Sequence, residues 1–164
     1  MSKLISSVTG LKGNGGAVTI ESVADILERE LQSVIEEWLM RVEKEPDLTR
    51  ILLNYGDRTG HLPQLLHDVI DRLRMDEHTK APISNAAAHH GDLRHKQGYT
   101  VAMAVEESRL LQVSIFTTLH NNVKQLEFSQ LFDVVTIADE VDTQLKEQML
   151  RFMAADASEK ANGK

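Results

Sequence analysis

The spacing of apolar residues constrains the fold of this chain more than any other feature. Between residues 20 and 153, apolar side chains recur every three or four positions, the period of one face of an α-helix. The β-prone stretches at 18–20 and 134–137 lie inside this helical periodicity, and no segment combines period-two alternation with turn residues. The pattern predicts an all-α protein, a single bundle of about five or six helices joined by short loops.

Capping residues, prolines and glycines divide this region into helices. Thr19 or Ser22 can cap the first helix, and Pro46 stops it because proline cannot continue the hydrogen-bond ladder. Gly98 suits the left-handed end of the fourth helix, and Thr100 caps the fifth. The predicted elements are a helix over 20–44, a short helix capped by Asp47 that buries Ile51 and Leu52, a loop over 56–60, a helix opening at Pro63, and helices over 82–98, 100–122 and 127–153.

Composition shifts at both ends of the 164-residue chain predict one domain flanked by two flexible segments. Residues 1–18 hold four of the nine glycines and little apolar pattern, so we interpret them as a mobile arm. Residues 154–164 are small and polar and are interpreted as a flexible tail. The helical domain is therefore expected over residues 19–153.

Charge and cysteine content exclude several classes of protein. The formal net charge of −7 argues against nucleic-acid binding, which depends on neutralising phosphates with Lys and Arg. The lack of Cys suits a reducing cytoplasm, where we expect the protein. No apolar run approaches the roughly 20 residues that a membrane span needs.

The sequence lacks the motifs that commonly mark an enzyme. It contains no GxSxG elbow, no GxxxxGK[ST] loop and no GxGxxG turn. Glu106 and Glu107 are adjacent and point to diverging faces of one helix, so they do not form an acid pair. We expect a non-enzymatic protein with no catalytic residue.

Seven histidines raise the question of a metal or a cofactor. His90 and His95 are five residues apart, and His61 and His67 are six apart, so neither pair shares a helical face for metal binding. No metal site is predicted, although ligands from different helices stay possible. Haem bound through one imidazole is an alternative. Phosphoryl transfer through His89 or His90 is another alternative. In known phosphotransfer proteins a basic residue follows the histidine and a Gly follows that residue, whereas Gly91 directly follows His90 here.

Apolar residues lie on more than one face of the last two predicted helices. A helix that is apolar nearly all round is either central in its domain or buried against a partner. Both interpretations stay open here. The second predicts a homodimer formed through the last two helices.

The segment 88–112 carries more ionisable groups than packing requires. His90 and Arg94 are four residues apart and share a helical face, and Glu107 can pair back to either across the Gly98 turn. Arg109 lies two residues after Glu107 and faces another side. These residues predict a polar clamp between two helices, in which a nearby carboxylate raises the pKa of His90. The simpler interpretation is a structural salt bridge that fixes the interhelical angle.

The order His90, Arg94, Gly98, Glu107, Arg109, followed by two leucines, resembles the N-terminal domain of RsbT co-antagonist proteins of the RsbRD type. That domain is also found ahead of bacterial sensor kinases. The resemblance implies a sensory input domain, globin-like without haem, that dimerises and signals to a kinase or a STAS-type protein. We therefore expect a signal-input domain of stress or two-component-type signalling. A haem- or ligand-binding sensor and a histidine phosphotransfer protein are the alternatives.

Overall fold

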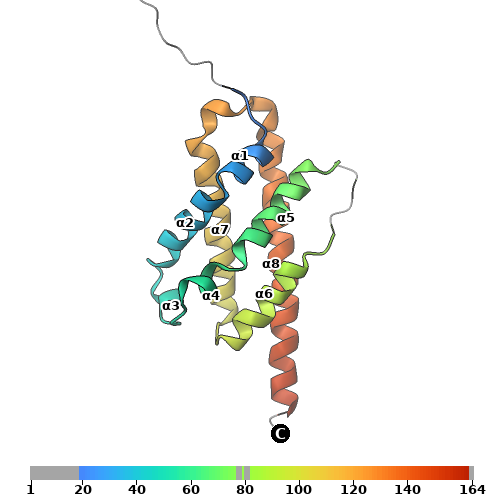
Figure 1. Cartoon of the computed structure of the whole chain (residues 1–164). Coiled ribbons are helices and arrows are strands. Elements are labelled where there is room, and N and C mark those ends of the chain that lie inside the picture. The colour runs from blue at the N-terminus through green and yellow to red at the C-terminus, as the bar shows by residue number, and fades with distance from the viewer. Residues whose placement is uncertain (1–18, 77–78, 80–81, 163–164) are drawn as a thin grey trace, which may run out of the picture.

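The computed structural model describes residues 19–76, residue 79 and residues 82–162. Within these ranges the chain forms helices and no strand, which confirms the all-α prediction (Figure 1). The predicted arm over residues 1–18 lies outside the described residues. None of the described helices combines the length and hydropathy needed to cross a membrane.

The predicted first helix is two helices, α1 (Val23–Arg29) and α2 (Leu31–Val42). Ser22 caps α1 as expected, its hydroxyl accepting the backbone N–H of Asp25 at 3.1 Å. Between the two helices, the backbone of Glu30 leaves the helical region, with φ −96° and ψ 11°. Apolar residues on the inner faces of both helices form part of the core.

Two short helices follow. Pro46 opens α3 (Pro46–Thr49), so Asp47 lies in its first turn instead of capping it. The helix ends too early to turn Leu52 inward: Leu52 is 94% exposed, and Leu48 takes the buried position. The prediction that Leu52 is buried is therefore wrong.

The loop predicted over residues 56–60 is also wrong. These residues belong mostly to α4 (Tyr55–Thr59). The side chain of Asn54 caps this helix by accepting the backbone N–H of Asp57 at 2.8 Å. This cap supports a helical turn despite the low helix propensity of glycine.

The next three helices lie close to their predicted bounds: α5 (Leu62–Arg74), α6 (Asn85–Lys96) and α7 (Val101–Asn121). Ser84 caps α6 and Thr100 caps α7, each through its side-chain hydroxyl. Gly98 has φ 80°, the left-handed conformation that glycine adopts most easily, and it turns the chain from α6 into α7.

Two 3₁₀ turns, η1 (Val123–Gln125) and η2 (Phe128–Gln130), lead into α8 (Leu131–Asn162). The helix continues to Asn162, through most of the predicted tail over residues 154–164. The segment after Met153 is rich in alanine, the strongest helix former, and Lys160 pairs with Asp156 one turn earlier at 2.6 Å.

The inner face of α8 is more polar than its apolar pattern predicted. Glu140, Gln144 and Gln148 are buried, whereas Phe128 and Val135, two apolar residues of the helix predicted over 127–153, are exposed. Gln144 Nε2 donates to the carbonyl oxygen of Leu65 in α5 at 3.0 Å, so this face is held partly by hydrogen bonds. Because polar residues occupy the buried face of α8, some of its apolar residues lie on the exposed face.

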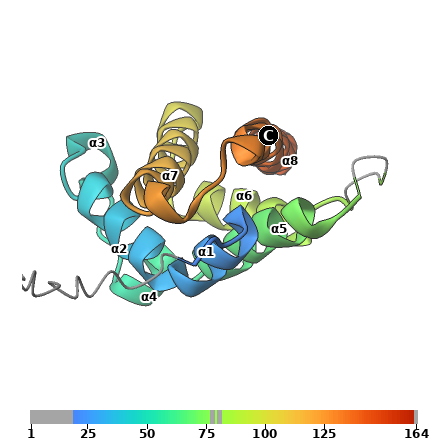
Figure 2. The ribbon, with the colours of Figure 1, turned by 90° about the horizontal axis from the view of Figure 1, so that it is seen from above.

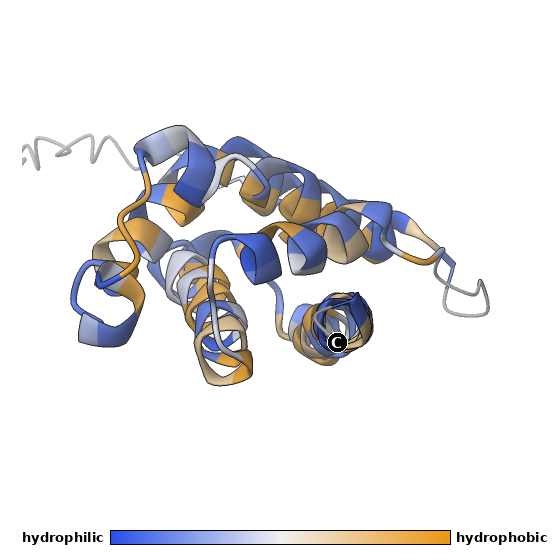
Figure 3. Ribbon diagram, turned by 90° about the horizontal axis from the view of Figure 1, so that it is seen from below, coloured by the Kyte–Doolittle hydropathy of each residue, from blue (hydrophilic) through white to orange (hydrophobic). Residues whose placement is uncertain are grey.

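Seen from above, α7 and α8 lie on one side of the molecule, with α1, α2, α5 and α6 on the other (Figure 2). The helix α6 has its largest contact with α8, and α2 has its largest contact with α7. Hydrophobic positions occur on more than one side of α7 (Figure 3). The core between the helices includes the fully buried Trp38 of α2, Ile115 of α7 and Ile137 of α8.

Candidate functional site

A buried ion pair joins α6 to α7. Arg94 Nε donates to Glu107 Oε2 at 2.8 Å, and the two side chains are 0% and 3% exposed. Both groups therefore interact in a medium of low dielectric, where an unpaired charge is costly. The pairing confirms the prediction that Glu107 reaches back across the Gly98 turn.

The remaining donors of Arg94 tie the pair to α4. Arg94 Nη1 donates to the carbonyl oxygen of Asp57 at 3.0 Å, and Nη2 donates to that of Arg58 at 2.9 Å. Nη1 also donates to the side-chain oxygen of Gln97 at 2.7 Å. One side chain thus connects three helices, α4, α6 and α7. We call Arg94, Glu107 and the residues bonded to them the polar clamp.

Tyr99 completes the clamp on the far side of Glu107. Its hydroxyl donates to Glu107 Oε1 at 2.8 Å and accepts from Arg58 Nη1 at 3.1 Å. Its ring centroid lies 4.8 Å from the guanidinium carbon of Arg94. Burial raises the pKa of Tyr99, and the charge of Glu107 adds to this effect, so the hydroxyl is a donor at neutral pH.

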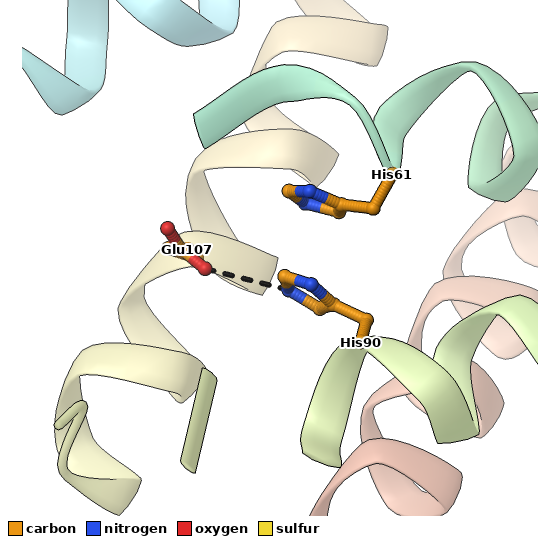
Figure 4. Close-up of side chains that lie close together, drawn as sticks. All are labelled: His61, His90 and Glu107. Atoms are coloured by element: carbon orange, nitrogen blue, oxygen red, sulfur yellow. Dashed lines mark ion pairs between the residues drawn. The ribbon is translucent and has the colours of Figure 1, made fainter. Parts of the chain in front are cut away.

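Two histidines lie beside Glu107 of this ion pair (Figure 4). His90 Nε2 lies 3.4 Å from Glu107 Oε2. His61, which precedes α5, stacks on His90 with ring centroids 3.6 Å apart and an interplanar angle of 13°. The indole of Trp38 meets the His61 ring edge-on, with centroids 6.0 Å apart. Four helices therefore meet at this cluster.

The pKa of His90 is shifted in the direction opposite to the prediction. Burial lowers it, and the hydrogen bond and charge of Glu107 only partly oppose that effect. Burial also holds the pKa of His61 well below its usual range, and the positive charges of His90, when it is protonated, and of Arg94 lower it further. Both imidazoles are neutral at neutral pH.

Glu107 is ionised beside these neutral rings. Burial alone would raise its pKa, but the hydrogen bond from His90 and the charge of Arg94 together lower it. The cluster therefore combines one carboxylate, one guanidinium and two neutral imidazoles.

The other sequence-predicted residues lie outside this cluster. Arg109 is exposed and pairs with Glu106, Nε to Oε2 at 2.9 Å. His89 is exposed on α6, whereas His90 is only 2% exposed and is closed to a phosphoryl donor. Arg109 and His89 therefore take no part in the clamp.

Sequence reasoning missed Arg58, His61 and Tyr99. Arg58 and His61 are distant from segment 88–112 in the chain, and no spacing rule links residues of different helices. Tyr99 directly follows Gly98, so its position at the turn between the two helices was the one sequence feature that could have identified it as part of the site.

The interior beside the histidines is small. A cavity of about 20 Å³ is lined by His61, His90, Glu107, Gln148 and neighbouring apolar residues. The rings stack directly on each other, which leaves no space for a porphyrin between them. The cavity is also far below the roughly 300 Å³ of typical cofactor pockets. This arrangement does not fit haem.

Comparison with known proteins adds no relative. No family model, no curated protein and no solved structure matches this chain.

Proposed function

We propose that this protein is a non-enzymatic signal-input domain that acts as a homodimer through α7 and α8. The observation that carries the proposal is the outer stripe of α8, an exposed helical face. The stripe is apolar at both ends and charged between them. Its members are Phe132, Val135, Asp139, Asp142, Lys146, Leu150 and Met153.

The apolar side chains of this stripe are more exposed to water than is favourable for a free surface. Phe132 is 79% exposed and Val135 is 66% exposed, and Phe128 beside them is 91% exposed. Phe128 also lines an apolar groove of about 440 Å³, together with Phe116 and Val134. Exposed apolar side chains of this kind are typical of protein–protein contact sites.

A second copy of the chain suits this surface. The helix α8 has 32 residues, and its C-terminal part extends beyond the rest of the fold (Figure 1). Val101 and Val105 add exposed apolar side chains on α7. Two long helices from each subunit would bury these residues in a helical bundle.

The polar clamp supports a role in signalling. It fixes α7, one of the proposed dimer helices, to α4 and α6 through buried bonds. A change in these bonds would alter how α7 presents its outer side to the second subunit. The output partner, proposed from the motif resemblance alone, is a kinase or a STAS-type protein of bacterial stress or two-component-type signalling.

Sedimentation at micromolar concentration tests the dimer. We expect twice the chain mass of 18.4 kDa for the wild type and a monomer for Phe132→Glu. Leu52→Glu is the matched control, because it adds the same charge at an exposed apolar residue outside the stripe. A wild-type monomer, or a dimer unaffected by Phe132→Glu, would contradict the proposal.

A further inference from the structure

We propose that His61, His90 and Glu107 form a binding site for one divalent transition-metal ion of the zinc class. Each residue offers a ligand atom, and the three atoms lie within 4.8 Å of one another. His61 is the N-cap residue of α5, and the other two residues come from α6 and α7. This inference concerns metal binding and does not depend on dimerisation.

The donor set suits a transition metal. Two imidazole nitrogens and one carboxylate oxygen are the protein ligands of known three-ligand zinc sites, which leave a further position for water. Mg²⁺ and Ca²⁺ prefer sites made of oxygen atoms. The chain has no Cys that could offer a competing thiolate site. We therefore expect Zn²⁺ or Co²⁺ to bind in preference to Mg²⁺.

Buried nitrogens without partners point to an occupant. Within the described part of the chain, His61 Nδ1 and His90 Nδ1 are inaccessible and have no hydrogen-bond partner. Both residues line the same cavity of about 20 Å³. Buried polar atoms without partners are rare because each costs free energy. A cavity of this size holds one small species, such as an ion or a water.

Ligation requires a defined charge state of the cluster, because metals bind neutral imidazole and ionised carboxylate. Arg94 opposes a second cation because its guanidinium already contacts Glu107 Oε2. The ion must therefore be held mainly by the two histidines.

Binding requires the stacked rings to separate. The lone pair of an imidazole nitrogen lies in the ring plane, and two nearly parallel planes 3.6 Å apart do not converge on one ion. His61 is the less buried of the two, so its ring is the one expected to turn. Because Trp38 contacts the His61 ring and is the only tryptophan, its fluorescence reports this movement.

Titration of the chelator-treated full chain with Zn²⁺ and Co²⁺ tests the site. We expect one ion per chain, a change in Trp38 fluorescence, and d–d absorption of Co²⁺ with nitrogen ligands. His61→Gln should weaken binding by about tenfold or more. His67→Gln and His89→Gln are matched controls at exposed histidines and should bind as the wild type does.

Two further measurements separate loss of the metal site from loss of the fold or of the dimer. A thermal melt shows whether each variant is folded, and Zn²⁺ should raise the Tm of the wild type but not of His61→Gln. Phe132→Glu, the dimer variant, should bind metal unchanged. No binding by the wild type, equal binding by wild type and His61→Gln, or metal bound without any change at Trp38 would each overturn the proposal.

Discussion

Arg94 of α6 and Glu107 of α7 form an ion pair of 2.8 Å in which neither side chain is more than 3% exposed. Each charge depends on the other, because a buried charge that loses its partner keeps the whole cost of desolvation. The backbone carbonyls of α4 that accept from Arg94 depend on the same side chain. This pair is therefore expected to dominate the energetics of the clamp.

Replacing Arg94 with Ala should lower the free energy of unfolding by about 3–5 kcal/mol, because it leaves Glu107 buried and unpaired. Urea denaturation measures the change. Arg109→Ala is the control: it removes the same side chain from an exposed pair and should cost about 1 kcal/mol or less. Equal losses for the two variants would mean that the clamp contributes nothing beyond a surface pair.

Acid should destabilise the fold in a defined window. The pKa values of His61 and His90 are lowered by burial, so below their ordinary value of 6.5 the unfolded chain binds protons that the folded chain does not. The free energy of unfolding therefore falls as the pH drops below 6.5. The slope is at most about 1.4 kcal/mol per pH unit for each histidine.

Urea titrations between about pH 7.5 and pH 5.5, with chelator present, measure this slope. His61→Gln should make it shallower, because glutamine does not titrate. The exposed His67→Gln should leave it unchanged. A slope that is the same in all three proteins would show that His61 is not protonated differently in the folded and unfolded states.

Replacing Gly91 with Ala should destabilise the contact between α6 and α8. A Cβ at Gly91 would collide with the backbone carbonyl oxygen of Gln148, and backbone cannot turn aside as a side chain does. We expect a loss of about 1–3 kcal/mol in unfolding experiments. Gly56→Ala is the control, since its Cβ would meet only the Asn54 side chain at 3.4 Å and should be tolerated.

Local signals in the sequence predicted most of the helices, and they failed where tertiary contacts decide. Ser22, Gly98 and Thr100 act as expected because capping and left-handed turns depend on near neighbours. Gln144 and Gln148 of α8 are buried against α5 and α6, which no helical period reveals.

The candidate site also has a part that local sequence signals predicted and a part that depends on tertiary contacts. The pair of Arg94 and Glu107 was predictable, because a single glycine turn separates their helices. His61 was not, since its contact with His90 joins helices that are far apart in sequence. The direction of the pKa shift of His90 also depended on burial, which the sequence pattern of α6 did not show.

The most direct test of the account is the dimer dissociation constant of Tyr99→Phe. This change removes the hydroxyl that bonds Glu107 Oε1 but leaves the charges and the stripe on α8 intact. If the clamp controls how α7 meets the second subunit, the constant measured by sedimentation should shift about fivefold or more from wild type. A constant equal to that of the wild type, with the variant folded, would contradict the link between the clamp and the dimer.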